Sequence, residues 1–287
     1  MRGRATIRAE GADGRDRTGR AWAHLIFEDR SSDCAFVERV WRSHSDRAGD
    51  FLSVAANHFE MVVTRVRGRT LLTLRGPETK ATIADCPADG DWLGIRFTLG
   101  TFMPRLPPGN LRDRRDVTLP GATSRAFWLN GSACEYPTFE NAEEFVARLA
   151  RQGIIARDAS VEAALGRHSG GLSQRSTQRH FLRATGLTQG TVRQIERARY
   201  ATNLLRGGVT VLDAVYESGY FDQPHLARSL KCLVGQTPME IMRGGQQLSF
   251  LYKTTRLTQL YDAREGGLHD RITTDCGVRG QSGRRSR

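Results

Sequence analysis

The spacing of apolar residues changes near residue 140, and this change limits the folds that the chain can adopt. Before it, short runs rich in Val, Ile, Leu, Phe and Thr alternate with glycine and proline, which predicts an antiparallel β domain. These runs lie at 51–55, 60–66, 70–74, 81–84 and 94–98, and Arg67-Gly68-Arg69 is expected to close a hairpin. From Ala142 onward apolar residues recur at helical spacing, first at Phe145, Val146, Leu149 and Ala150. The sequence therefore predicts a β domain followed by helices.

Clear helix boundaries appear from residue 160 onward. Residues suited to cap helix starts precede the apolar stretches, namely Ser160, Ser173, Thr210, Asp222 and Thr237. A capping box at Thr191–Gln194 predicts the start of a longer helix that runs to Leu205. Glycines at 186, 207–208, 219 and 235 fit helix ends. In the helix after Thr210 we expect the apolar side chains to face inward, namely Leu212, Val215 and Tyr216.

The formal net charge of +12 over 287 residues is unevenly distributed. It is +2 over residues 1–30, zero over 31–164, +6 over 165–243 and +4 over 244–287. A basic segment beside a neutral one indicates an anionic partner for the basic segment alone.

Several classes of protein are not expected from this composition. No apolar stretch approaches the roughly 18 to 20 residues of a membrane span, and the Arg- and Gly-rich start lacks the apolar run of a secretory signal. The five cysteines contain no CxxC pair, so we expect neither a disulfide framework nor a structural zinc site. They are Cys34, Cys86, Cys134, Cys232 and Cys276.

Two of the predicted helices each carry an apolar stripe opposite a polar one. In the helix over 174–184 the inward residues are Thr177, Phe181 and Ala184, and the outward residues are Arg175, Gln178, Arg179 and Leu182. In the helix after Asp222 the inward residues are Leu226, Leu230 and Leu233, and the outward residues are Pro224, Ala227, Arg228 and Lys231, with His225 beside them. Arg can pair with guanine and Gln with adenine in a major groove. The alternative is a helical bundle with solvated basic faces.

Residues 160–243 resemble the C-terminal DNA-binding domain of the AraC/XylS family of transcriptional regulators. The resemblance rests on three stretches: GLSQRSTQRHFLRATGL (171–187), ERARYATNLL (196–205) and VTVLDAVYESGYFDQPHLARSLKCLVGQTPMEI (209–241). It implies two helix-turn-helix units, joined by a linker helix, whose recognition helices enter adjacent major grooves on one face of the DNA. The expected fold is therefore α+β, with a small antiparallel N-terminal β domain carrying a helix and an all-α C-terminal domain.

The resemblance also implies which residues contact DNA. By position these are Arg175, Gln178 and Arg179 in the first unit and Gln223, His225 and Arg228 in the second, with Lys231 on a phosphate. Phe181, Gly186 and Gly219 match structural positions of the family pattern. Three features depart from it, namely Tyr220-Phe221, Pro224 and Leu230. These departures affect sequence preference more than fold.

The neutral N-terminal part fits the family's sensing or dimerisation domain. A ligand pocket there has seven candidate residues, namely Trp41, His44, His58, Trp92, Phe97, Phe102 and Trp128. The alternative is that these are ordinary core and edge residues. Since His44 and His58 lack the spacing of a cupin metal site, we expect no metal, and we expect no cofactor.

The predicted organisation has four segments. They are a flexible basic extension at 1–30, a sensor or dimerisation domain at 31–155, the AraC-type DNA-binding domain at 156–243 and a tail at 244–287. We expect a cytoplasmic, nucleoid-associated protein that is not an enzyme and binds double-stranded promoter DNA. Further candidate partners are RNA polymerase, a small-molecule effector and a second copy of the chain; no membrane partner is expected. The alternatives are a DNA-repair alkyl-transfer enzyme with an AraC-type module and a nonspecific nucleic-acid-binding protein.

Overall fold

A computed structural model describes residues 5–7, 24–113, 116–165 and 173–244. Contacts divide the chain into one compact unit at 1–251 and another at 252–287, so every described residue belongs to the first. Most of the predicted extension and all of the predicted tail except Gly244 lie outside the described residues. The predicted boundary between residues 155 and 156 stays a prediction.

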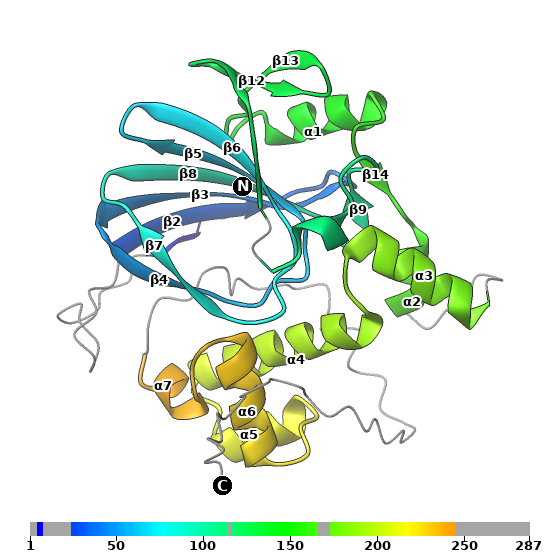
Figure 1. The fold of residues 1–287 in the computed structure, drawn as a ribbon. Coiled ribbons are helices and arrows are strands. Elements are labelled where there is room, and N and C mark those ends of the chain that lie inside the picture. Colours follow the sequence, from blue (N-terminus) through cyan, green and yellow to red (C-terminus); the bar gives the residue numbers. More distant parts are fainter. Residues whose placement is uncertain (1–4, 8–23, 114–115, 166–172, 245–287) are drawn as a thin grey trace, which may run out of the picture. The chain divides into compact units, whose positions relative to one another are not determined.

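A seven-stranded antiparallel sheet with the order β1-β2-β3-β8-β5-β6-β10 forms most of the N-terminal region (Figure 1). In that order the strands are Ala5–Ile7, His24–Ser31, Val37–Arg47, Gly90–Phe97, Glu60–Val66, Arg69–Arg75 and Val117–Leu119. Smaller antiparallel sheets join β4 (Gly49–Ser53) to β7 (Thr82–Cys86), β9 (Thr101–Phe102) to β14 (Ala156–Arg157), and β11 (Gly121–Thr123) through β12 (Ala126–Leu129) to β13 (Ser132–Glu135). The prediction of an antiparallel β domain is confirmed.

The large sheet includes part of the segment that was predicted to be a flexible extension. Strand β2 (His24–Ser31) pairs along its length with β3, and Leu25 and Phe27 are buried. The prediction is therefore wrong for residues 5–7, which pair with β2 as β1, and for residues 24–30. The reason is that alternate apolar side chains in this segment point into the sheet's packed face, where their burial stabilises a strand.

The hairpin between β5 and β6 is confirmed, with a shorter loop than expected. Val66 pairs with Arg69, so only Arg67 and Gly68 form the loop. Their φ angles are 49° and 72°, both in the left-handed region. Two-residue hairpin loops adopt this geometry because its twist matches that of the strands, and glycine accepts it without a steric cost.

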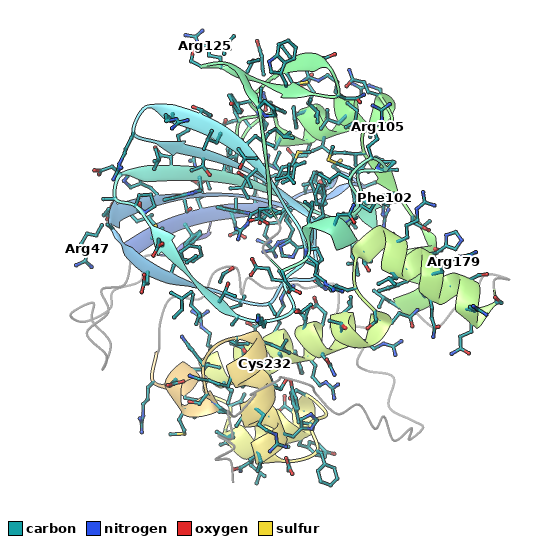
Figure 2. The ribbon with its side chains drawn as sticks, in the orientation of Figure 1. Arg47, Phe102, Arg105, Arg125, Arg179 and Cys232 are labelled. Carbon is teal, nitrogen blue, oxygen red and sulfur yellow. The ribbon has the colours of Figure 1, made fainter. Side chains whose placement is uncertain are left out.

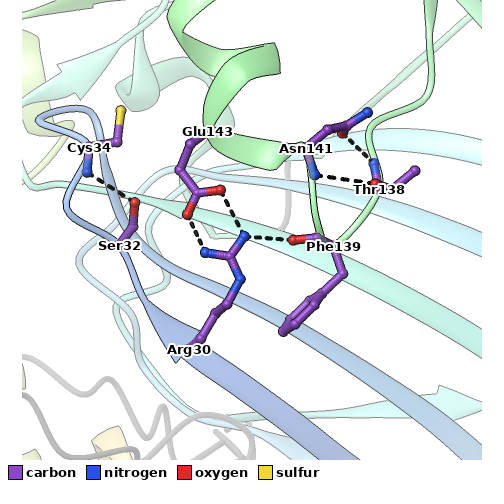
Figure 3. A network of polar contacts seen from close by, with 7 residues as sticks. All are labelled: Arg30, Ser32, Cys34, Thr138, Phe139, Asn141 and Glu143. Carbon is purple, nitrogen blue, oxygen red and sulfur yellow. Dashed lines mark hydrogen bonds and ion pairs between the residues drawn. The ribbon is translucent and has the colours of Figure 1, made fainter. Parts of the chain in front are cut away.

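Helix α1 (Ala142–Arg151) closes the apolar core of the N-terminal region. Ala142, Phe145, Val146 and Leu149 are buried in this core, as their spacing predicts. Arg30 of β2 anchors the start of the helix: its Nη2 donates to Glu143 Oε2 at 2.7 Å and to the Phe139 carbonyl oxygen at 2.6 Å (Figure 3).

The C-terminal region is helical, which confirms the predicted fold class (Figure 1). Its helices are α2 (Ser160–Leu165), α3 (Gln174–Thr185), α4 (Gln189–Arg206), α5 (Val211–Glu217), α6 (Gln223–Leu233) and α7 (Pro238–Met242). Four predicted caps are confirmed, because each side chain accepts a hydrogen bond from the first helical turn; they are Ser173, Thr210, Asp222 and Thr237. Ser160 is instead the first residue of α2, and its backbone amide donates to Asp158 Oδ1 at 3.0 Å.

The start of α4 differs from the prediction. The helix begins at Gln189, and its cap is Thr188. The predicted cap was Thr191, three residues later. Thr188 Oγ1 accepts a hydrogen bond from the Thr191 backbone amide at 3.1 Å. Thr191 therefore lies in the first turn and supplies the amide that is capped.

We expect Thr188→Ala to lower the free energy of unfolding of the full chain by about 1 kcal/mol, because it removes this cap. Thr191→Ala leaves the cap in place and is expected to cost less than about 0.5 kcal/mol. Chemical denaturation measures both values. A larger loss for Thr191→Ala than for Thr188→Ala would contradict the assignment.

The inward face of α5 also differs from the prediction. Val215 is buried as expected, together with Ala214, but Leu212 and Tyr216 are 65% and 68% exposed. This short helix has apolar residues on two faces. The face with Ala214 and Val215 packs against α4 and α6, so Leu212 and Tyr216 on the other face point away from the core.

His58 is a buried basic group close to three arginines. Burial, and then the positive charges of Arg96, Arg199 and Arg75, lower the pKa of His58 well below 6.5. In the unfolded chain the imidazole regains an ordinary pKa near 6.5. Below that pH the unfolded chain therefore binds more protons than the folded chain, and stability rises with pH.

We therefore expect the free energy of unfolding to fall as pH drops from about 7.5 to 5.5, by up to about 1.4 kcal/mol for each pH unit below the unfolded pKa. His58→Gln should flatten this dependence, because glutamine does not titrate. Urea denaturation of both chains across this range measures it. An identical slope in the variant and the wild type would show that His58 is not responsible.

Candidate nucleic-acid interface

Helix α3 presents the first predicted recognition face. Phe181 and Ala184 are buried in the core that the helices share, and Thr177 is half-buried. The three predicted DNA contacts are exposed on the opposite side, with Arg179 labelled in Figure 2; they are Arg175, Gln178 and Arg179. The predicted inward and outward stripes of this helix agree with the structure.

The end of α3 needs glycine for two reasons. Gly186 has a φ of 73°, and a Cβ there would lie 2.7 Å from the backbone nitrogen of Gly109. Gly109 belongs to the 3-10 helix η1 (Pro108–Leu111) of the N-terminal region. Helix α3 therefore ends in close backbone contact with η1.

Helix α6 presents the second predicted recognition face. Its apolar stripe is buried as predicted, and consists of Leu226, Leu230 and Leu233. Gln223, Arg228 and Lys231 are exposed. Lys231 Nζ lies 3.5 Å from Glu240 Oε2, so a carboxylate of α7 accompanies the predicted phosphate contact.

His225 differs from the other six predicted contacts because it is partly buried. Its ring meets the Tyr220 ring edge-on at a centroid distance of 5.1 Å. Burial, followed by the charge of Arg197, lowers the pKa of His225. His225 therefore packs against Tyr220 at the start of α6, and only the rest of its ring is free to contact DNA.

Arg197 of α4 fixes the second unit to the linker helix. Its guanidinium lies 5.1 Å from the centre of the Tyr220 ring, and Nη1 donates to the Gly219 carbonyl oxygen at 3.3 Å. The Tyr220 hydroxyl is 2.8 Å from Ser229 Oγ of α6. Sequence reasoning missed Arg197, although its place in the ERARYATNLL stretch was a signal.

Phe221 is a second residue whose position the sequence did not reveal. It directly precedes the Asp222 cap of α6, and its side chain is 87% exposed. An exposed phenyl ring beside a recognition helix can make apolar contact with thymine methyl groups.

The seven candidate pocket residues do not form one site. Trp41, His58, Phe97 and Phe102 are buried, and Trp128 is 47% exposed. His44 and Trp92 line a common hollow of about 460 Å³, together with Arg42, Asp91 and Phe139 among others.

Comparison with protein families assigns the C-terminal region to a class. Residues 169–244 match a family model described as a helix-turn-helix domain. This domain is of the AraC type, which confirms the resemblance to AraC/XylS-family regulators over these residues. Residues 169–244 therefore form a DNA-binding helix-turn-helix domain of the AraC type. Comparisons with curated proteins and with solved structures gave no match.

The described residues lack two kinds of feature. Within them, no helix has the length and apolar character needed to span a membrane. The same residues include no group of three His, Cys, Asp or Glu side chains placed to hold a metal ion.

Proposed function

We propose that the protein is a sequence-specific regulator that reads two adjacent major grooves with α3 and α6. The observation that carries this proposal is the matched design of the two helices: each is capped, buries an apolar stripe and exposes a polar one. Base contacts are assigned to Arg175, Gln178, Arg179, Gln223 and Arg228, a shared role to His225 and a phosphate contact to Lys231. No catalytic step is part of this proposal.

The proposed modulation of DNA binding through the N-terminal region rests on its packing against the helices. Leu52, Val54 and Ala55 belong to the same apolar core as α3, α4 and α6. The hollow beside His44 and Trp92 has a volume typical of small-molecule sites, which makes it the candidate effector site. A second copy of the chain and RNA polymerase remain proposed partners, and the nucleoid in the cytoplasm is the proposed location.

Selection from a random duplex library with the full chain tests the proposed function. We expect an enriched site with two motifs about 10 base pairs apart, the distance between successive major grooves on one face. Binding that falls with salt but enriches no motif would instead support a nonspecific nucleic-acid-binding protein.

A further inference from the structure

The N-terminal region contacts the linker helix α4 and the end of α6 at a junction. It is formed by Leu52, Ala55, Asn57 and Ala81 on one side and by Glu196, Arg199, Cys232, Leu233 and Gly235 on the other. Part of it is a buried polar network. Asn57 Nδ2 donates to Glu196 Oε1 at 2.6 Å, and Arg199 Nη1 donates to Asn57 Oδ1 at 3.2 Å. Arg199 Nη1 also lies 3.1 Å from Glu196 Oε1. The Asn57 amide therefore satisfies a carboxylate and a guanidinium of α4 at once.

The junction also holds the end of α6. The last carbonyl groups of a helix have no partner within it. Here the backbone amide of Ala55 donates to the Leu233 carbonyl oxygen at 2.7 Å, and that of Ala81 donates to the Cys232 carbonyl oxygen at 2.8 Å. Leu52 packs so closely that a Cβ on Gly235 would lie 2.8 Å from its Cδ1.

The first unit is held by η1 of the N-terminal region and by the segment that directly precedes α2. Gly186 at the end of α3 lies against η1, and His180 Nδ1 of α3 lies 3.4 Å from Asp158 Oδ2. These contacts and those of the junction leave the exposed faces of α3 and α6 uncovered. The N-terminal region thus touches both recognition helices at separate places without blocking either face.

We propose that Asn57 is a positioning residue for DNA binding. It holds the linker helix α4 through Arg199 and Glu196, and α4 in turn holds the second unit through Arg197, so that α3 and α6 are presented to DNA together. The inference rests on the proposed function. Two helices that must enter grooves one turn apart bind well only if their separation is fixed beforehand. Loss of the Asn57 side-chain contacts removes this polar link between the N-terminal region and α4 and loosens the hold on the second unit. The backbone hydrogen bonds from Ala55 and Ala81 to α6 remain, and neither recognition face is altered.

The test compares two DNA probes with the full chain. One probe is the two-motif site selected with the wild type, and the other has one motif scrambled. Asn57→Ala is expected to bind the two-motif probe roughly tenfold more weakly, a typical size for coupling between sites. Its binding to the single-motif probe should match the wild type. Asn203→Ala, which changes an exposed asparagine of α4, is the matched control and should leave both affinities unchanged.

A second experiment compares the single variant Asn57→Asp with the double variant that also carries Glu196→Gln. Asn57→Asp places a second carboxylate against Glu196 and should also weaken two-motif binding. Adding Glu196→Gln restores a donor opposite the new carboxylate, keeps the net charge of the network and should recover most of the affinity. This rescue depends on the contact itself and is not expected from a general loss of stability.

Four results would overturn the inference. Wild-type affinity of Asn57→Ala for both probes would show that the contact has no role in binding. An equal loss on both probes, or no rescue by Glu196→Gln, would show that Asn57 serves only the stability of the chain. If the wild type itself selects no motif, the proposed function fails and the inference fails with it.

Discussion

Replacing Arg179 with alanine is expected to weaken binding of the full chain to its selected DNA site by about 1–3 kcal/mol, which is about 5- to 150-fold in affinity. The guanidinium is exposed on α3, on the side opposite the buried Phe181 ring (Figure 2). The guanidinium can donate two hydrogen bonds to one guanine, and alanine can donate none, so Arg179→Ala should lower both the affinity and the preference for that base. Titration of the selected site and of its single-base variants measures both effects.

Arg228→Ala on α6 should cause a loss of similar size, with relaxed preference at a base in the second motif. Arg151→Ala is the matched control, since it removes the same charge from an exposed position on α1. The assignment of recognition faces is wrong if Arg179→Ala and Arg228→Ala bind like the wild type. An equal loss for Arg151→Ala would assign the effect to net charge.

The largest effect on stability is expected for Phe181→Ala, at about 3–5 kcal/mol. Phe181 is only 1% exposed and lies in the core that α3, α4 and α6 share with the N-terminal region. Its truncation removes buried apolar area and leaves a cavity that close-packed neighbours fill only in part. Chemical denaturation of the full chain measures the loss. The slope of the unfolding free energy against denaturant concentration is compared between variants to check that they unfold in the same way.

Leu182→Ala tests whether that loss comes from burial. Leu182 is the next residue of the same helix, its side chain is 47% exposed, and its substitution should cost less than about 1 kcal/mol. If both substitutions cost the same, the inward face of α3 is not the one described. Phe181→Ala should also weaken DNA binding, because a loosened α3 no longer presents Arg175 and Arg179 rigidly.

Local patterns predicted the helices well because caps and apolar stripes are local features. Ser173, Thr210, Asp222 and Thr237 could be assigned from residue type and position alone. The start of α4 was missed because Thr188 and Thr191 are both good caps, and only the backbone geometry selects between them. Which stripe of α5 faces inward depends on where α4 and α6 lie, and the sequence of α5 does not contain that information.

The exposed polar stripes of α3 and α6 could be predicted for the same reason, whereas the junction could not. Arg199 and Asn57 are 142 residues apart in the sequence, and neither belongs to a motif that names its partner. The prediction of a ligand pocket from seven residues was inaccurate for a related reason. Aromatic and histidine side chains are common in β domains, and only the fold separates His44 and Trp92 at a hollow from Trp41 and Phe97 in the core.

The footprint of the full chain on its selected DNA tests two-groove reading most directly. Methylation protection of guanine N7 reports contacts in the major groove. Two protected major-groove segments about one helical turn apart on the same face are predicted. Arg179→Ala should remove protection from one segment and Arg228→Ala from the other. Protection of a single major groove, or of two segments on opposite faces of the duplex, would contradict the proposal.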